Sequence, residues 1–452
     1  MFKKYIIFSF LIFLLISCGT DYYYSSFVIR KDLQWFASPS EQENINDYSS
    51  ISSQSGNFNE YTSPSIVSTP ANYIVAIYES RSQFNGNLLG VDGNNVANVR
   101  ASISLNAASF KEFNNYVGKQ AYTAEDSKGS PITFLTPNGK IIVIAIGGVG
   151  LSDGGKDDRS IIYKTKSENN GYKWDDWTEL DTNTFEKLTK DKYDRYYTNP
   201  GNGIVLGNGT LACMIDFKKK GNGNTNPEGA AILYSGDSGE TWRIGGKMMY
   251  NGTHRSARII AERTDGSLLI AAVPNINGTD YNTKGPLKWG IAKTINSDIE
   301  DFQVTYEGTT NPFEKNSAGT VSGDRIKYTS NGISGNAIIL IHSWDYREMP
   351  RPNGGTYQTH NSSAISISKN EGKTWSMITN IVGQDPHPKY KATFRQSLKV
   401  LKDGTIALAI EEGNGEKITT TPPAGSTLNF IPTYRRVSLE SLSEGTYKYE
   451  GL

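Results

Sequence analysis

The chain has 452 residues, with 46 Lys and Arg against 46 Asp and Glu, and so a formal net charge of zero. This balance gives no electrostatic case for binding nucleic acid or an anionic membrane surface. Gly (45) and Tyr (26) are frequent, as expected for many short strands joined by tight turns. The length suits one large all-β domain or two to three smaller ones.

The first eighteen residues predict an exported bacterial lipoprotein. Lys3 and Lys4 precede an apolar run from Tyr5 to Ile16, which is short for a bilayer span and typical of a signal-peptide core. The run ends in Leu-Ile-Ser-Cys18, which resembles a lipobox, whose cysteine is lipidated and becomes the first mature residue. We expect a signal peptide over 1–17 and a membrane anchor at Cys18, on the periplasmic side or at the cell surface. The alternative is an ordinary signal peptide that ends near a cysteine.

Residues 18–58 predict a flexible tether between this anchor and a folded domain over 59–452. The segment is rich in Ser, Asn, Gln and Tyr and has no sustained hydrophobic period, which is typical of a linker. The second cysteine, Cys213, lies in the apolar run 210–215 and is expected to be a buried strand residue. Once Cys18 is acylated, no intramolecular disulfide can form.

A repeated motif indicates β-hairpins. Residues 167–174, 235–242 and 368–375 share the pattern Ser-x-Asp/Asn-x-Gly-x-Thr/Lys-Trp, and each follows a run with strand character. In a hairpin turn, the Ser and Asp/Asn side chains satisfy backbone N–H groups, Gly adopts a positive φ, and the Trp packs on the next layer of strands.

The spacing of these motifs predicts the architecture. Ser167 and Ser235 are 68 residues apart, and Ser235 and Ser368 are 133 apart, close to twice that distance. Degenerate copies lie at 102–110 and 294–302. A period of about 66 residues suits a four-stranded blade, so we expect an all-β, six-bladed β-propeller. Residues 395–452 and the segment near 60 would complete the sixth blade and join the chain ends. The alternative is five separate hairpins in a sandwich or β-helix.

The motif resembles the Asp-box, or bacterial neuraminidase repeat, and the chain is similar to the sialidase superfamily from about Tyr61 to its C-terminus. The similarity extends beyond the boxes to five other segments: 61–67 followed by 74–81, 201–211, 258–269, 397–406 with Glu411, and 434–442. The resemblance implies a six-bladed propeller whose Asp-boxes lie on the periphery, so function depends on other residues.

The resemblance also implies a chemistry. Sialidases release terminal sialic acids with retention: three arginines bind the sugar carboxylate, a tyrosine activated by a glutamate attacks the anomeric carbon, and an aspartate is the acid/base. Matching the motifs assigns Arg81 as a substrate-binding arginine and Asp92 as the acid/base. It implies no cofactor, and sialylated or other acidic glycans are the expected partners.

Several positions depart from the family pattern. The three clamp arginines should lie at Thr62, within Val273–Asn275 and within Thr359–Asn361. The nucleophilic tyrosine should lie at Arg395, and the activating glutamate near Ala257. These departures predict that other residues take over the roles, or that the roles are lost.

Candidate replacements lie nearby in the sequence. For substrate binding they are Arg258 or Arg255 from the fourth blade, Arg347 or Arg351 from the fifth, and Arg395 from the sixth. For catalysis they are Tyr390 or Tyr346 as nucleophile, and Glu262, the carboxylate nearest Ala257, as the activating glutamate. For each of them, a solvated loop charge or a packed aromatic ring is the alternative interpretation.

The leading functional prediction is an exo-α-sialidase-type retaining hydrolase that acts on cell-surface glycoconjugates. One alternative is a catalytically inactive propeller that binds glycans, which the missing tyrosine and first arginine favour. Another is a propeller glycosidase or lyase that uses Asp92 with a different partner. The four His residues show no ligand-like spacing, so no metal site is expected.

Overall fold

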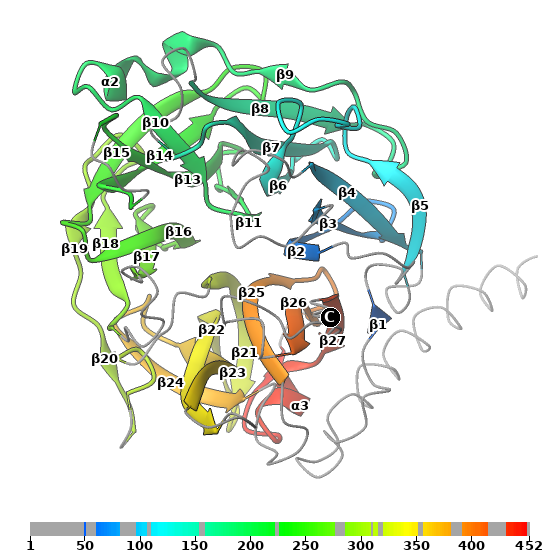
Figure 1. Ribbon diagram of the computed structural model, residues 1–452. Helices are drawn as coiled ribbons and strands as arrows, with labels where there is room; N and C mark the ends of the chain where they lie inside the picture. Colours follow the sequence, from blue (N-terminus) through cyan, green and yellow to red (C-terminus); the bar gives the residue numbers. More distant parts are fainter. Residues whose placement is uncertain are drawn as a thin grey trace, which may run out of the picture.

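The computed structural model describes residues 49–50, 60–81, 96–105, 110–152, 159–221, 226–275, 285–308, 311–314, 320–350, 356–380, 391–414 and 431–449. Within these ranges the strands form six sheets arranged around a common centre (Figure 1). The expected six-bladed β-propeller is therefore confirmed.

Four blades follow a regular order from the centre outward. Blade 1 consists of β2 (Glu60–Ser68), β3 (Ile74–Arg81), β4 (Ala97–Ser104) and β5 (Lys111–Tyr116); blade 2 of β6 (Gly129–Leu135), β7 (Ile141–Gly148), β8 (Ser160–Ser167) and β9 (Thr178–Glu179). Blade 4 consists of β16 (His254–Glu262), β17 (Leu268–Pro274), β18 (Lys288–Ala292) and β19 (Glu300–Asp301); blade 6 of β25 (Lys391–Val400), β26 (Ile406–Asn414), β27 (Ile431–Val437) and β1 (Ser49–Ser50).

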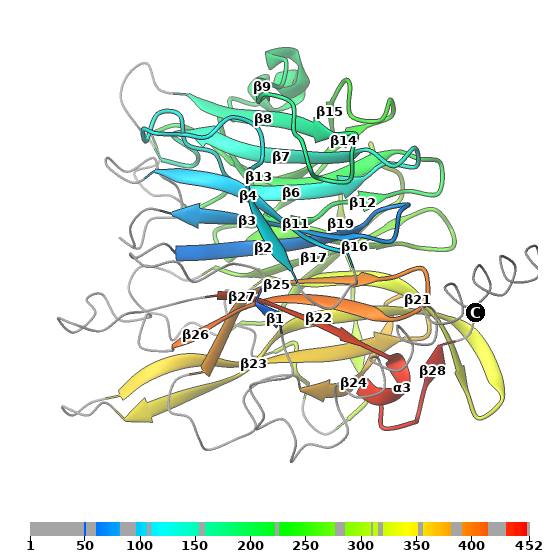
Figure 2. The same cartoon turned by 90° about the vertical axis from the view of Figure 1, so that its right-hand side faces the viewer.

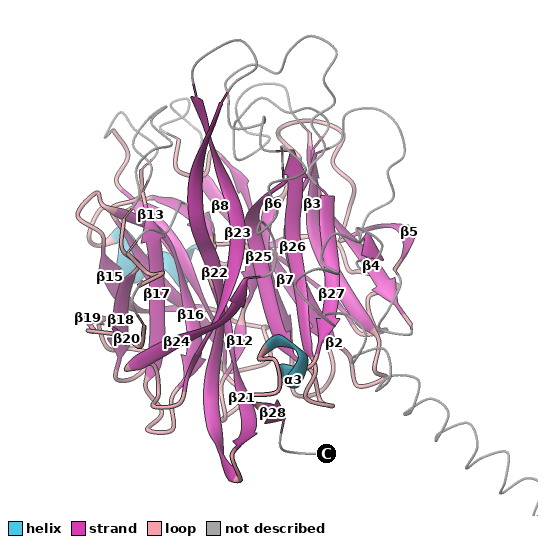
Figure 3. Ribbon diagram, turned by 90° about the horizontal axis from the view of Figure 1, so that it is seen from below, coloured by secondary structure: helices cyan, strands magenta, loops and turns pink. Residues whose placement is uncertain are grey.

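Blades 3 and 5 carry further strands, and blade 2 has one extra strand, β11 (Gly201–Asn202), paired with β6. In blade 3, β13 (Leu211–Lys218), β14 (Gly229–Ser235) and β15 (Arg243–Met249) are joined by β10 (Arg195–Thr198) and β12 (Ile204–Val205), which both pair with β13. In blade 5, β21 (Ser322–Ser330), β22 (Ile333–Pro350), β23 (Thr356–Ser368) and β24 (Thr374–Asn380) are flanked by β20 (Thr305–Tyr306) and β28 (Lys448–Tyr449). The short helical segments are a 3-10 turn (Thr182–Phe185), α2 (Glu186–Thr189) and α3 (Leu439–Leu442). Figure 3 shows the β22–β23 hairpin extending beyond its neighbouring strands.

The five predicted hairpins are confirmed. Each of blades 1 to 5 contains one of them, and it joins the third and fourth strands of that blade. In the second complete copy, Ser235 Oγ donates to Asp237 Oδ1 (2.7 Å) and accepts from Gly239 N (2.8 Å), while Trp242 Nε1 donates to Gly239 O (3.0 Å). The other two complete copies repeat these bonds. The turn is therefore held by contacts within eight residues.

Each complete Asp-box also packs against the preceding blade. A Cβ added at Gly239 would lie 2.3 Å from Ile142 on β7, and one at Gly372 would lie 2.5 Å from Leu269 on β17. Trp375 is fully buried and its ring centroid lies 5.4 Å from that of Trp289 on β18. The glycine is required by its positive φ and by this close approach.

The hydrophobic core lies between the blades. Among the buried residues described, the apolar side chains divide into six clusters, and each cluster combines two neighbouring blades. On β22, Ile338 and Leu340 pack toward blade 4, whereas Ile339 and Ile341 pack toward blade 6. Because alternate side chains of a strand face opposite sides of a sheet, the middle strands are apolar without interruption.

The ring closes differently from the expectation. β1 pairs with β27, so residues 49–50 supply the outer strand of blade 6, whereas the segment near residue 60 forms the innermost strand of blade 1. Residues 49–50 lie within the segment that the sequence predicted to be a tether. After β27 the chain continues through α3 to β28, which pairs with β21 of blade 5 (Figure 2). Backbone pairing with two different blades thus secures the C-terminal segment.

Candidate active site

A β-bulge interrupts the innermost strand in four of the described blades. The register shifts between Thr62 and Ser65 in β2, between Gly129 and Ile132 in β6, between Arg255 and Arg258 in β16, and between Thr393 and Gln396 in β25. Ser63, Ser130 and Ser256 lie in three of these bulges and adopt positive φ. Because a bulge changes the direction of the adjacent side chains, polar residues converge at the centre.

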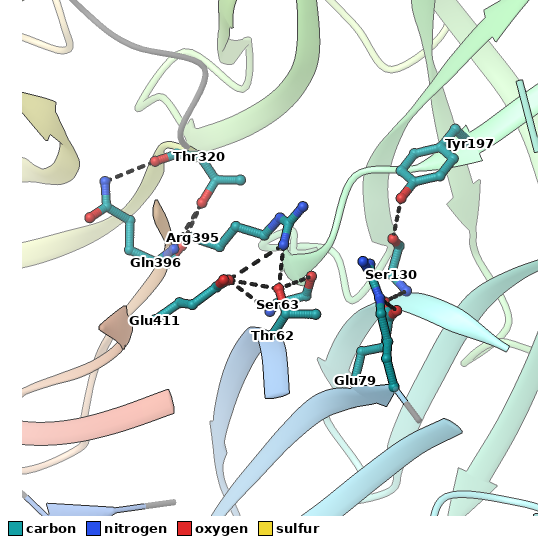
Figure 4. A network of polar contacts seen from close by, with 10 residues as sticks. Thr62, Ser63, Glu79, Ser130, Tyr197, Thr320, Arg395, Gln396 and Glu411 are labelled. Atoms are coloured by element: carbon teal, nitrogen blue, oxygen red, sulfur yellow. Dashed lines mark hydrogen bonds and ion pairs between the residues drawn. The ribbon is translucent and has the colours of Figure 1, made fainter. Parts of the chain in front are cut away.

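Arg395, Thr62 and Glu411 form the first part of this convergence (Figure 4). Thr62 Oγ1 donates to Glu411 Oε2 (2.7 Å) and accepts a hydrogen bond from Arg395 Nη1. The Arg395 guanidinium also lies 3.4 Å from Glu411 Oε2, which accepts from Ser63 N as well. All four residues are buried. An arginine from blade 6 is thus held against Thr62, where the family pattern places its first clamp arginine.

Glu79, Ser130 and Tyr197 form the second part (Figure 4), together with Arg81, which pairs with Glu79. Glu79 makes an ion pair with Arg81 and accepts a hydrogen bond from Ser130 N (2.8 Å). The hydroxyl groups of Ser130 and Tyr197 lie 2.6 Å apart. A Cβ added at Gly129 would lie 3.0 Å from the Glu79 carboxylate, so the bulge also makes room for this acid. Burial, followed by the charge of Glu79, raises the pKa of Tyr197.

Arg258 and Gln396 lie beside the first part. Arg258 Nη1 donates to Val321 O (3.0 Å) and to Gln396 O (3.3 Å). Thr320 fixes Gln396 through two hydrogen bonds. Gln396 N donates to Thr320 Oγ1 (2.9 Å), and Gln396 Nε2 donates to Thr320 O (2.9 Å). Burial lowers the pKa of Arg258 to about 9, with the nearby charge of Arg395 as the second cause.

A short segment of blade 3 crosses the centre and supports these residues. Between β10 and β12 the chain leaves blade 3, and β11 (Gly201–Asn202) runs parallel to β6 of blade 2. Asn202 accepts from Ile66 N (2.8 Å) in blade 1 and donates to Leu398 O (3.2 Å) in blade 6. Gly201 lies against the Arg258 guanidinium, with an added Cβ 2.4 Å from Nη1. The crossing segment thereby links blades 1, 2, 4 and 6.

The electrostatics of the assembled site favour an anion. It contains three guanidinium groups, from Arg81, Arg258 and Arg395, and two carboxylates, from Glu79 and Glu411. All five side chains are buried, where Coulomb interactions are stronger than in water. Planar guanidinium groups bind carboxylates through paired hydrogen bonds. Arg81 is paired with Glu79 and Arg395 with Glu411, so the five groups together carry a net charge of +1.

One predicted site residue, Glu262, is not part of this arrangement. Glu262, the carboxylate nearest the position expected for the activating glutamate, is the last residue of β16 and accepts a hydrogen bond from Gly207 N (2.6 Å). Its cross-strand partner Leu268 pairs with Ala292, next to the fourth hairpin turn. Glu262 therefore lies at the rim with the hairpin turns, four residues along β16 from Arg258 and about 13 Å away. The structure does not bring it to the centre.

Three other predicted residues, Asp92, Tyr390 and Cys18, lie outside the described residues. Arg347 lies on β22 opposite Thr359 of β23. Sequence reasoning missed Tyr197 and Ser130, because a Tyr within a four-residue strand and a Ser near the start of another strand carry no local signal. Glu79 was visible only as the acidic residue two positions before Arg81.

In the part of the chain described, no group of three or more His, Cys, Asp or Glu residues is arranged to hold a metal ion. The described residues also contain no helix long and apolar enough to cross a membrane.

Comparisons with known proteins agree with the fold. The family described as "BNR repeat-like domain" matches residues 63–274. A sialidase of Paraclostridium sordellii is 26% identical over 204 residues, which cover 44% of this chain and 47% of that protein. A sialidase of Clostridium perfringens is 25% identical over 293 residues, 58% of this chain and 73% of that protein. The chain thus spans about half the length of the first of these relatives.

Solved structures show the same architecture. Trypanosoma rangeli sialidase in complex with sialic acid superposes with a TM-score of 0.57 at 11% identity, over 88% of this chain and 58% of that one. At 11% identity this likeness shows a similar fold only. The repeat-family match and the two sialidase relatives show a similarity in sequence. Together with the six blades and the Asp-box turns, the BNR repeat-like match and the two sialidase relatives support the sialidase superfamily for this chain.

Proposed function

We propose that the propeller recognises a terminal acidic sugar, such as sialic acid, at the Arg395–Thr62–Glu411 site. One observation carries this proposal: Arg395, from blade 6, contacts the hydroxyl of Thr62 and the carboxylate of Glu411. A guanidinium is thereby restored at the position where the family pattern expects a clamp arginine and this sequence has a threonine. The superfamily includes a protein described in complex with sialic acid, which supports the same ligand class.

Binding to paired glycans tests this proposal. Isothermal titration of the purified protein with sialyllactose and with lactose compares an acidic sugar with its neutral counterpart. We expect binding of sialyllactose only, and a loss of affinity of at least about tenfold in Arg395→Ala, because one charge-assisted contact is worth about 1.5–3 kcal/mol. Arg243→Ala is the matched control, since Arg243 is exposed on β15. Equal affinity for the two sugars would contradict the proposal.

A second candidate function is hydrolysis of α-sialosides, with Asp92 as the acid/base. Membership of a superfamily of sialidase-type hydrolases favours it, and Asp92 follows the Arg81 strand in the sequence. The tyrosine of the described site, Tyr197, has a raised pKa, the opposite of what an activated nucleophile needs. Release of a fluorophore from an α-sialoside, lowered by orders of magnitude in Asp92→Ala, would support hydrolysis. Binding without release would support a glycan-binding role.

We also propose that the protein is exported and held at a membrane through Cys18. The basic n-region, the short apolar core and the lipobox-like Leu-Ile-Ser-Cys18 support this. Expressed in a bacterial host, the full chain should enter the membrane fraction and carry a lipid on its N-terminal peptide in mass spectra. Cys18→Ser should abolish both. An unmodified Cys18 in the membrane fraction would contradict lipidation.

A further inference from the structure

A buried carboxylate between blades 3 and 4 is not part of the site described above. Asp216 lies on β13 and is 2% exposed. Its Oδ1 accepts hydrogen bonds from Asn199 Nδ2 (2.9 Å) and from the Tyr250 hydroxyl (2.8 Å), and its Oδ2 accepts from Ser256 N (2.9 Å). A buried carboxylate that accepts three hydrogen bonds fixes the side chains and the backbone that donate them.

The Asp216 carboxylate fixes the bulge of β16. Ser256 has φ +52, a left-handed conformation that is unfavourable for a residue other than glycine. The backbone of the bulge is bound by side chains of blade 3 and the turn that follows it: Ser256 N by Asp216, Ala257 N by the Tyr250 hydroxyl (2.9 Å), and Ala257 O by Asn199 Nδ2 (2.9 Å). These contacts maintain the strained conformation.

The bulge leads directly to the central site. Its last residue is Arg258, whose guanidinium lies against Gly201 and donates to Gln396 O beside Arg395. Asn199 lies two residues before Gly201, at the start of the crossing segment. Asp216 is therefore bonded both to the strand that carries Arg258 and to the segment against which Arg258 rests.

We propose that Asp216 is a positioning residue: its ionised carboxylate locks the bulge at Arg255–Arg258 and so places Arg258 beside the acidic-sugar site, and protonation of Asp216 releases the lock. The link to sugar binding rests on the proposed function, whereas the lock itself rests only on the contacts around Asp216.

Proton uptake by Asp216 is favoured by its surroundings. Burial raises the pKa of Asp216 to about 6, and the donors and the charge of Arg255 oppose this rise only in part. The titratable and charged groups on β13 and the elements packed against it are Cys213 and Lys218 on β13, Arg195, Tyr196 and Tyr197 on β10, Tyr234 on β14, Tyr250 after β15, and His254, Arg255, Arg258 and Glu262 on β16; β14 places Ala230 opposite Asp216.

A protonated Asp216 must donate a hydrogen bond rather than only accept them. Asn199 Oδ1 is buried and has no hydrogen-bond partner in the described structure. A flip of the Asn199 amide would present this oxygen to the new proton. The flip would also break the contact between Asn199 Nδ2 and Ala257 O, so protonation would loosen the bulge at a second point.

Amide hydrogen exchange of the full chain, followed by mass spectrometry, tests the lock without any ligand. After correction for intrinsic exchange rates, we expect protection of the peptide covering 254–262 to fall severalfold between about pH 7.5 and about pH 5. In Asp216→Asn the protection should be low at both pH values. Asp237→Asn, a change in an Asp-box turn, should behave like the unchanged protein. Protection in Asp216→Asn equal to that of the unchanged protein at about pH 7.5 would overturn the proposal.

A milder change keeps the test valid if Asp216→Asn does not fold. Tyr250→Phe removes only the hydroxyl that joins Asp216 to Ala257 N, and it should lower protection of the same peptide at about pH 7.5. Unchanged protection would count against the lock. Titration with sialyllactose separates the two proposals: absence of binding with the exchange result intact contradicts only the proposed function. Binding with the same pH dependence in the unchanged protein and in the Asp216 variant contradicts only the claim that the lock positions Arg258 at the sugar site.

Discussion

The crossing segment at the centre of the ring predicts a severe effect of a small change, Gly201→Ala. Gly201 has φ +135, a region that costs a residue with a Cβ about 1–3 kcal/mol. The added Cβ would also lie 2.4 Å from Nη1 and 2.6 Å from Cζ of Arg258, so the guanidinium must move. If the Arg258 guanidinium loses its hydrogen bond to Val321 O or to Gln396 O, the loss costs about 1.5–3 kcal/mol more. We therefore expect a loss of about 3–6 kcal/mol in the free energy of unfolding.

Urea unfolding followed by tryptophan fluorescence measures this loss. The matched control is Gly266→Ala, because Gly266 also has a positive φ (+80) but has nothing within 4 Å of an added Cβ. The control should lose only the conformational cost of about 1–2 kcal/mol. Equal losses in the two variants would refute the reasoning, since they would mean that Arg258 adjusts without cost and that the crossing segment does not support it.

Three other changes have expected outcomes in the same unfolding assay. Glu411→Gln removes the buried charge beside Arg395 and should cost about 3–5 kcal/mol; an unchanged free energy of unfolding would show that the ion pair contributes nothing. Trp375→Ala removes a fully buried ring and should cost about 3–5 kcal/mol, whereas the same change at the half-buried Trp174 should cost less. Because burial raises the pKa of Asp216 from 3.8 to about 6, ionisation of this carboxyl lowers the global free energy of unfolding, even though the ionised form closes the bulge locally. Global stability is highest below about pH 4, and about 3 kcal/mol is lost as the pH rises through about 6. Asp216→Asn should lack this slope, and identical slopes would contradict the assignment.

Ring closure shows where sequence reasoning reached its limit. The pattern indicated that the chain ends meet in blade 6, and β1 does pair with β27. The N-terminal strand that does so is Ser49–Ser50, inside a polar segment without a strand period. A two-residue edge strand is selected by the open edge it covers, so its own residues carry no signal.

The amino-acid sequence by itself determined the hairpins and, through their spacing, the propeller. The Asp-box turns are held by contacts between residues two to four positions apart, such as Ser235 with Asp237 and Gly239, and such contacts recur wherever the pattern recurs. The site was decided only by the tertiary structure. Arg395 and Thr62 are 333 residues apart, and Thr62 and Glu411 are 349 apart. Only closure of the ring places an arginine of the last blade against a threonine of the first.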